Sequence, residues 1–481
     1  MRTIDAATMT RMITDYGTVA RLSGAPETMI GPDVIIDSRK ATAGAFFVAL
    51  PGESADGHDF VGAAYEQGAA AVMVTHPVDA EITQVIVNDT AAGLTSLARA
   101  VHACAREEGL RTVAITGSAG KTSTKDLTHQ VLSAVGATVS PTGSYNNEIG
   151  TPLTVCRVGQ NTDFLVAEMG SRAAGDIAHL CSIARPDVAM VCNVGSAHIG
   201  EFGSRENIAR AKGEIYEALP TEGWAALNAN DPLVAAMWQR TAAHRAAYRV
   251  GGQPVFDVPG VELEVHADGI VLDDLQRAGF TLVATQDDQV SSASVQLKVI
   301  GAHQVTNAAA AATAALCLGV DLQIVADALS NAVPRSPMRM EFHELANGAA
   351  VINDAYNANP DSMAAALRTL ASMIADRRRT NPRARALAVV GDMLELGSDE
   401  VQLHRAMGEL AAQLGIDEVW AIGDFAEVIA DGAGERGRVT RVDRAAGSLQ
   451  LDDGDVVLVK ASRALGLERV ANELVDREDT R

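Results

Sequence analysis

One glycine-rich segment combines residue types that suit phosphate chemistry. Residues 112–126 read TVAITGSAGKTSTKD, an apolar run typical of a strand, then a glycine loop, then a segment with apolar residues on one helical face. Glycines let backbone N–H groups converge on phosphate oxygens, and the start of a helix adds partial positive charge. A lysine reaches the outer phosphates and the next hydroxyl binds Mg²⁺. The segment predicts a nucleoside triphosphate site formed by Gly117, Ser118, Ala119, Gly120, Lys121, Thr122 and Ser123.

The loop is shorter than the common phosphate-binding pattern, which would place a glycine where Ile115 stands. A plain glycine turn beside a surface lysine would contain the same residue types. Strand, turn, Lys-Thr pair and amphipathic helix occur in one order, and this agreement favours the phosphate loop. We therefore predict that Lys121 is catalytic and that Thr122 binds Mg²⁺.

Two further polar residues stand where strands are expected to end. Glu168 closes the run FLVAE, and His198 follows the run PDVAMVCNV. The carboxyl ends of parallel strands meet at one edge of a sheet, where α/β folds bind ligands. Each residue alone would more often be an ordinary loop residue. Together, a carboxylate and an imidazole beside phosphates predict a site for a divalent cation.

Lys212 is unusual because it lies among apolar residues of an expected helix over residues 206–219. The stripe that contains it is Ile208, Lys212, Ile215 and Leu219, at the spacing of one buried helical face. The ordinary explanation is that the long side chain reaches the surface. The alternative is that burial favours the neutral amine, which reacts with CO₂ to form a carbamate that binds metal. The pattern alone leaves both open.

Three stretches of the chain alternate strands and helices, as parallel sheets covered by helices do. A length of 481 residues also fits about three domains at ~150 residues each. We predict an α/β protein with units at residues 1–109, 110–334 and 335–481, the central one carrying the phosphate loop. Short period-two runs between residues 261 and 299 predict an antiparallel insert.

Composition excludes several classes of protein. The formal net charge of −22 at pH 7 repels nucleic acids and anionic membranes, so no nucleic-acid partner is expected. The N-terminus lacks the apolar core of a signal peptide and no run is long enough to span a bilayer, so no membrane insertion is expected. The five scattered cysteines form no disulfide framework, which favours a cytoplasmic protein.

The motifs together resemble those of the Mur ligase family, in family order and across nearly the whole chain. They are TGSAGKTSTKD, SYNNEIGTP, VAEMG, AHIGEFGS, RAKGEI, LNANDP, GAHQVTNAAAA, SPMRMEF, INDAYNANPDSM, GDMLELG and VKASR. The resemblance implies a three-domain architecture: a small N-terminal α/β domain that binds the UDP-sugar, a central ATP-binding P-loop domain, and a C-terminal Rossmann-like domain that binds a dipeptide.

The resemblance also implies an activity. Within the family it is closest to members that use ATP to join D-alanyl-D-alanine to UDP-N-acetylmuramoyl-tripeptide, through an acyl phosphate. This acid–D-amino-acid ligase reaction gives the pentapeptide precursor of peptidoglycan and so serves cell wall biogenesis, cell shape and cell division. The expected cofactors are ATP and two Mg²⁺, and a monomer is expected.

Residue roles follow from the same resemblance. Thr122 would hold one Mg²⁺, and Glu168, His198 and carbamylated Lys212 would hold a second, with Lys121, Lys212 and His198 as the catalytic residues. Asn307 resembles the family's adenine contact, Arg339 its phosphate-reaching arginine, and Asp354 its ribose contact. Gln304 departs from the family, which usually has Asn there.

The substrate contacts implied by the resemblance lie in loops. Ser38 and Arg39 would hold the UDP end, Asn146 and Asn147 the nucleotide-sugar peptide, and Tyr356, Asn357 and Asn359 the dipeptide. Without the resemblance, the asparagine-rich loops SYNNEIG and YNANPD would be interpreted as turns.

The motifs distinguish this ligase from rival functions. A related ligase that adds a diamino acid carries an Asp-Asn-Pro-Arg motif in its third domain, and this chain has none. A P-loop nucleotide switch would not need a buried lysine beside a Glu/His pair, and a kinase would release a stable phosphate ester. The third residue of the peptide and the group that takes the amine's proton are left open.

Overall fold

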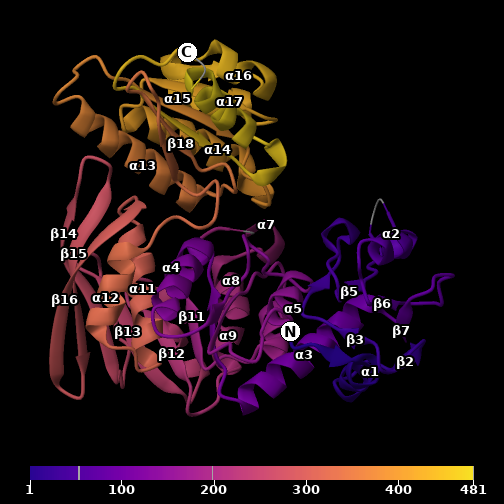
Figure 1. Cartoon of the computed structure of the whole chain (residues 1–481). Helices are drawn as coiled ribbons and strands as arrows, with labels where there is room; N and C mark the ends of the chain where they lie inside the picture. The colour runs from indigo at the N-terminus through magenta and orange to yellow at the C-terminus, as the bar shows by residue number, and fades with distance from the viewer. Residues whose placement is uncertain (53–54, 198, 480–481) are drawn as a thin grey trace.

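The computed structural model describes residues 1–52, 55–197 and 199–479, and within these ranges three large sheets follow one another along the chain (Figure 1). The strands at the centre of each sheet are parallel. Neighbouring residues of one strand, such as Ala388 and Val389 in the C-terminal sheet, belong to two different apolar clusters. Helices therefore pack on both faces of that sheet, and the α/β prediction is confirmed.

The N-terminal sheet has the strand order β2-β7-β6-β5-β4, with β2 antiparallel to β7 and the other pairs parallel. Its strands are β2 (Ala20–Ser23), β4 (Val34–Ile35), β5 (Phe46–Val48), β6 (Ala71–Val74) and β7 (Thr83–Val87). Beside them lie β1 (Ile4–Asp5), β3 (Met29–Ile30), α1 (Ala6–Asp15), α2 (Val61–Glu66), α3 (Thr90–Glu107) and the 3₁₀ turns η1 (Ser38–Lys40) and η2 (Gly57–Phe60).

The central sheet has the order β16-β15-β14-β13-β12-β11-β8-β10-β9. Its strands are β8 (Arg111–Thr116), β9 (Thr138–Val139), β10 (Phe164–Glu168), β11 (Val188–Val191), β12 (Trp224–Asn228), β13 (His244–Val250), β14 (Leu263–Leu272), β15 (Arg277–Gln286) and β16 (Gln289–Ile300). The antiparallel run expected between residues 261 and 299 is the edge of this sheet, because β14 pairs in parallel with β13 and antiparallel with β15.

The helices of the central region surround that sheet. They are α4 (Lys121–Ser133), α5 (Gly150–Val155), α6 (Asp176–Ile183), α7 (Ile199–Phe202), α8 (Arg205–Lys212), α9 (Glu214–Glu217), α10 (Pro232–Ala235), η3 (Ala236–Arg240), α11 (Gln304–Cys317) and α12 (Leu322–Asn331). The Ala-rich α11 packs against α4. This packing fixes the position of the helix that follows the phosphate loop.

The C-terminal sheet has the order β17-β18-β22-β19-β20-β21 and is parallel except for β17. Its strands are β17 (Glu341–Glu344), β18 (Ala350–Asn353), β19 (Ala386–Gly391), β20 (Glu418–Ile422), β21 (Gly437–Val439) and β22 (Val456–Lys460). Its helical elements are α13 (Pro360–Arg377), η4 (Gly397–Asp399), α14 (Glu400–Gln413), α15 (Ala426–Ala433), η5 (Gly434–Arg436), α16 (Val442–Ser448), η6 (Arg463–Leu465) and α17 (Glu468–Asp479). None of the helices described in the chain has the length and apolar character needed to cross a bilayer.

The N-terminal and central sheets share one apolar cluster, which runs from α1 and α3 to β8, β10 and β11. A buried histidine lies at this junction. His102 on α3 places Nε2 2.9 Å from Oγ1 of Thr112 on β8. Burial, with the nearby charge of Arg106, lowers the pKa of His102 to about 4. The histidine is therefore neutral in the folded protein at neutral pH.

We expect His102 to make the protein less stable as the pH falls. The unfolded chain takes up this proton near pH 6.5, whereas the folded chain takes it up near pH 4. The free energy of unfolding should therefore decrease between these pH values, by at most about 3 kcal/mol. Urea unfolding of the wild type and of His102→Gln across this range measures the effect. Equal pH slopes for the two proteins would contradict it.

Candidate active site

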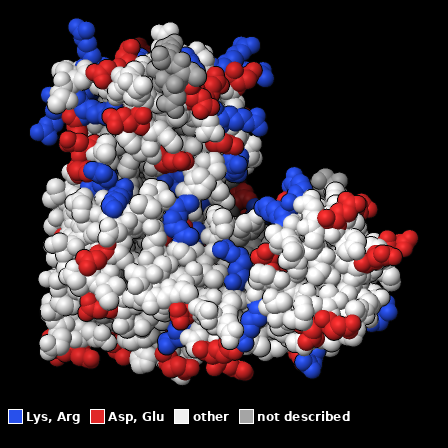
Figure 2. All heavy atoms as spheres, in the orientation of Figure 1, with Lys and Arg blue, Asp and Glu red and all other residues white. Residues whose placement is uncertain are grey.

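A cleft with a volume of about 1100 Å³ lies between the central and C-terminal sheets. Figure 2 shows the surface hollowed where the parts of the molecule meet, with Lys and Arg side chains along the hollow. The central region contributes the glycine loop, residues 144–150 and the start of α11. The C-terminal region contributes Arg339, residues 356–359 and Lys460. Groups from both regions therefore face one volume.

The glycine loop has the backbone that phosphate binding needs. Gly117 and Gly120 both have left-handed φ angles, +152° and +82°. A Cβ at Gly120 would lie 2.6 Å from Oδ1 of Asn307, so no larger residue fits there. Asn193, just after β11, accepts from Ala119 N with Oδ1 at 2.9 Å and donates to Ala119 O with Nδ2 at 3.1 Å. This side chain fixes the loop, and its place after an apolar strand is the signal that would have identified it.

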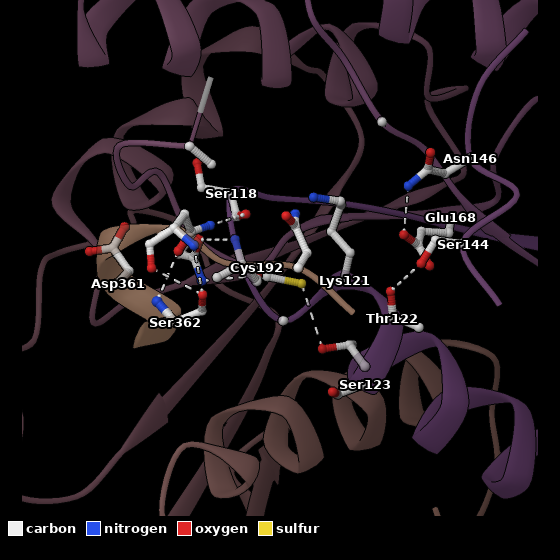
Figure 3. A pocket seen from close by; sticks show the side chains of 18 of the residues that line it. Ser118, Lys121, Thr122, Ser123, Ser144, Asn146, Glu168, Cys192, Asp361 and Ser362 are labelled. Carbon is white, nitrogen blue, oxygen red and sulfur yellow. Dashed lines mark hydrogen bonds between the residues drawn. The ribbon is translucent and has the colours of Figure 1, made fainter. Parts of the chain in front are cut away.

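The residues that follow the loop meet a group from the C-terminal region. Lys121 donates to Gly117 O at 2.7 Å, and burial lowers its pKa. Oγ1 of Thr122 lies 3.0 Å from Oγ of Ser144, as Figure 3 shows. Nη2 of Arg339 donates to the same Ser144 oxygen at 3.0 Å. The structure thus brings together Lys121, Thr122 and Arg339, the three residues predicted to contact phosphates. It adds Ser144, for which the sequence motifs predicted no role.

Arg339 is presented on an unusual backbone. Its neighbours Met338 and Met340 both have positive φ angles, +58° and +51°, which is costly for residues with a Cβ. The guanidinium lies over the ring of Tyr356, 4.3 Å from its centroid. Met340 N donates to Oδ1 of Asp354 at 3.1 Å. These contacts hold the arginine toward the central sheet.

Both carboxylate oxygens of Asp354 accept hydrogen bonds. Besides Met340 N, it accepts from Nζ of Lys460 at 2.6 Å, and this ammonium also donates to Asn357 O at 2.8 Å. Lys460 is buried, 2% exposed. The predicted ribose contact therefore lies in the cleft, and it also organises the segment that carries Arg339.

Glu168 ends β10 inside the cleft and is 1% exposed. Oε1 accepts from Nδ2 of Asn146 at 2.8 Å, as Figure 3 shows. Among the described residues, Oε2 has no hydrogen-bond partner. A buried carboxylate oxygen without a partner is costly unless it meets a cation. The Thr122 and Ser144 hydroxyls line the same cleft, and Mg²⁺ prefers oxygen ligands, so the residues present fit that ion.

Lys212 is buried with 1% exposure, so it does not reach the surface. Its Nζ lies 3.4 Å from Oγ of Ser171. Burial, with the charge of Lys121, lowers the pKa of Lys212 to about 7. A substantial fraction of this amine is neutral at neutral pH, and only a neutral amine can form a carbamate.

The single helix expected over residues 206–219 is wrong in one respect, because α8 ends at Lys212 and α9 begins at Glu214. Arg240 causes the interruption. Its Nη1 donates to Arg210 O at 2.6 Å, the carbonyl that Glu214 N would use in a continuous helix. It also lies 3.3 Å from Ala209 O, which still accepts from Gly213 N. A Cβ at Gly213 would collide with the guanidinium. Lys212 therefore stands at a helix end.

His198 lies outside the described residues, so its predicted metal and catalytic roles have no structural description. Within the described ranges, no three His, Cys, Asp or Glu side chains are arranged so that they could hold a metal ion. Of the residues predicted to hold the second ion, Glu168 and Lys212 lie within the described ranges, and both are buried.

The asparagine predicted to contact adenine is buried at the start of α11. Oδ1 of Asn307 accepts from Oγ1 of Thr124 at 3.2 Å, and Nδ2 donates to Oε1 of Gln304 at 2.9 Å. Gln304, the departure from the family pattern, therefore orients Asn307 through its own amide. Both residues line the cleft.

The predicted substrate residues occupy two places. Asn146, Asn147, Tyr356, Asn357 and Asn359 line the cleft. Oδ1 of Asn359 caps α13 by accepting from Ser362 N at 2.9 Å, and its Nδ2 lies 3.4 Å from Ser118 O of the glycine loop. Ser38 and Arg39 lie apart, on η1 of the N-terminal region, where Arg39 pairs with Asp37 at 2.9 Å.

Comparisons with known proteins agree along the chain. The descriptions "Mur ligase family, catalytic domain", "Mur ligase middle domain" and "Mur ligase, glutamate ligase domain" match residues 33–108, 115–315 and 338–463. The UDP-N-acetylmuramoyl-tripeptide–D-alanyl-D-alanine ligase of Mycobacterium tuberculosis (strain H37Rv) is 41% identical, covering 95% of each chain. The structure is similar to that of MurF from Acinetobacter baumannii, with a TM-score of 0.81, 30% identity and 99% of each chain covered. MurF from Thermotoga maritima, in complex with ADP, aligns with a TM-score of 0.72, 26% identity and coverage of 93% of this chain and 98% of that one.

Proposed function

The chain belongs to the Mur ligase family, and we propose that it joins D-alanyl-D-alanine to UDP-N-acetylmuramoyl-tripeptide at the expense of ATP. The observation that carries this function is the match to ligases of that name over 95% of both chains. The cleft agrees with it, because Arg339 from the C-terminal region meets the phosphate loop at Ser144. The function makes the protein an enzyme of peptidoglycan synthesis.

The reaction must overcome repulsion between like charges. A peptide carboxylate attacks the γ-phosphate of ATP to give an acyl phosphate and ADP, and the dipeptide amine then displaces phosphate. Lys121, the start of α4 and Arg339 place positive charge where the phosphoryl group moves. Binding both substrates beside the loop also holds the reacting groups close together and aligned, which lowers the entropic cost of the reaction. The chain therefore contributes mainly charge and alignment.

Magnesium is part of this proposal. When bound, it neutralises phosphate charge and orients the transferred group. We assign Thr122 to one ion, and Glu168, His198 and Lys212 as a carbamate to a second. The partnerless Glu168 oxygen and the buried, weakly basic Lys212 support the second assignment.

The remaining assignments concern substrates. Asn307, Arg339 and Asp354 are proposed to contact ATP, Asn146 and Asn147 the peptide, and Tyr356, Asn357 and Asn359 the dipeptide. Ser38 and Arg39 are proposed to hold the UDP end. The Nδ2 group of Asn359, already near Ser118 O, would place the dipeptide beside the phosphate loop.

The domain division 1–109, 110–334 and 335–481 is part of the same proposal, with UDP-sugar, ATP and dipeptide assigned in that order. β7 ends at Val87 and β8 begins at Arg111, while β16 ends at Ile300 and β17 begins at Glu341, which supports the division. A cytoplasmic monomer is proposed. Its five cysteines are free thiols, which suits a reducing compartment.

We expect ATP turnover to require both organic substrates. With UDP-N-acetylmuramoyl-tripeptide and D-alanyl-D-alanine present, the product should gain two alanines by mass spectrometry, with one phosphate released per bond. When UDP-N-acetylmuramoyl-dipeptide replaces the tripeptide substrate and free diaminopimelate or lysine replaces D-alanyl-D-alanine, no product should form. Phosphate release at the full rate without either substrate would favour a nucleotide switch. A gain of one amino acid would instead favour a diamino-acid ligase.

A further inference from the structure

A second lysine near the phosphate loop has no role in the function proposed above. Lys125 lies on α4, four residues after Lys121, and its side chain is 1% exposed. Its ammonium lies 2.6 Å from Oδ1 of Asp126. It also donates to the carbonyls of Pro141 and Gly143 at 3.1 and 3.3 Å. A buried ammonium is tolerated only when its N–H groups are paired, so these contacts belong to the folded state.

The same ammonium reaches the chain that leads to the C-terminal sheet. Nζ of Lys125 lies 3.4 Å from Oγ of Ser336, which is also buried. One side chain therefore joins three segments: α4, the loop that ends in Gly143, and the linker that contains Ser336. Contacts of this kind fix the spacing between segments rather than the shape of any one of them.

Both outer segments continue directly into the groups that meet at Thr122. Gly143 precedes Ser144, whose Oγ is 3.0 Å from Oγ1 of Thr122 and 3.0 Å from Nη2 of Arg339. Ser336 stands three residues before Arg339 in the chain. The left-handed residues on either side of Arg339 limit the conformations of this short connection. A shift at Ser336 would therefore be transmitted to the guanidinium.

We propose that Lys125 is a positioning residue that sets Ser144 and Arg339 against Thr122. Its side chain is not among those that line the cleft. By joining α4, the loop at Gly143 and the linker at Ser336, it fixes the relative positions of the phosphate-binding groups of the central and C-terminal regions. The proposal rests on the proposed function and deepens it, because it names what aligns the C-terminal arginine with the phosphate loop.

Three variants test this arrangement. Lys125→Met keeps the apolar stem and removes every donor, and Lys125→Arg keeps the charge and donors. The matched control is Gln130→Ala on the same helix. Gln130 holds the same linker through two hydrogen bonds to the backbone of Val333, both 3.0 Å. Among the described residues, none of its side-chain hydrogen bonds reaches the loop at Gly143. The control therefore loosens the linker, and removes one hydrogen bond to Asp126 O within α4, without removing a contact to the loop at Gly143.

The expected kinetic result is a loss of kcat at nearly constant KM. In the full-length enzyme, Lys125→Met should lower kcat about 30-fold or more, with KM for ATP and for the tripeptide substrate changed less than about 3-fold. Lys125→Arg should recover most of kcat. In an Arg339→Ala background, Lys125→Met should lower kcat by less than about 3-fold, because the residue it positions is gone.

Hydrogen exchange supplies a readout that does not depend on catalysis. Lys125→Met should speed exchange in residues 140–149 and 336–341, whereas Gln130→Ala should leave residues 140–149 unchanged. Normal kcat for Lys125→Met, full additivity with Arg339→Ala, or unchanged exchange in both segments would overturn the proposal. If the wild type does not ligate the dipeptide, the proposed function fails while exchange still decides the positioning role. If Lys125→Met does not fold, Ser336→Ala removes a single acceptor and is judged by the same exchange and kcat measurements.

Discussion

Replacing Lys121 with alanine should lower kcat at least about 100-fold, a loss of about 3 kcal/mol in transition-state stabilisation. Lys121 opens α4 and lies in the cleft beside Thr122. Its amine donates to Gly117 O at 2.7 Å, so it is held beside the loop before any phosphate arrives. A charge placed in advance stabilises the moving phosphoryl group without reorganisation at the moment of reaction.

The control for this change is Lys298→Ala, which removes an exposed lysine at the far edge of the central sheet on β16. Its kcat should match the wild type. Phosphate release measured with both substrates at saturation makes the comparison, and thermal unfolding checks that Lys121→Ala remains folded. A folded Lys121→Ala with more than about one tenth of the wild-type kcat would contradict the assigned role.

The second large effect is expected at Lys212. Lys212→Ala should be nearly inactive, with a loss of at least about 100-fold, because the carbamate proposed as a metal ligand can no longer form. Short carboxylic acids such as acetate or propionate should restore part of the activity by occupying the vacated space. Lys212→Arg should stay inactive, since a guanidinium keeps its charge and cannot take up CO₂.

Two controls separate this explanation from a general loss of packing. Acetate should not rescue Lys121→Ala, whose missing group is a cation. A ¹³C carbamate resonance should be present in wild-type protein equilibrated with ¹³CO₂, and Lys212→Arg should lack it. Normal activity of Lys212→Ala, or no resonance in an active wild type, would show that the lysine is only a core residue.

Some of the site could be predicted because its signals are local. The glycine loop, Lys121 and Thr122 form one stretch of chain, so strand, turn and helix propensities specify their geometry together. Glu168 was identifiable because a strand that is buried on both faces must end at the sheet edge. Lys212 was identifiable from its place on a buried stripe, and its 1% exposure agrees with that stripe.

Other contacts of the site join residues that are far apart in the sequence. Asn193 fixes the loop at Ala119 from 74 residues away, and Arg339 reaches Ser144 from 195 residues away. Such contacts depend on the order β11-β8-β10 and on where the C-terminal sheet docks. The interruption at Gly213 also comes from outside the helix, because the distant Arg240 takes a carbonyl that the helical pattern assigns to the helix itself.

By itself the sequence determined the α/β class, the phosphate loop and the resemblance to one family, because propensity, hydrophobic period and motif order are properties of neighbouring residues. Which side chains contact that loop from other parts of the chain depends on how the three sheets pack together. Lys125, Ser144 and Lys460 lie in recognisable motifs, yet their roles come from partners up to 211 residues away. Those partners are selected by the packing of separate sheets, and the burial that makes a lone ammonium costly is a property of the folded chain alone.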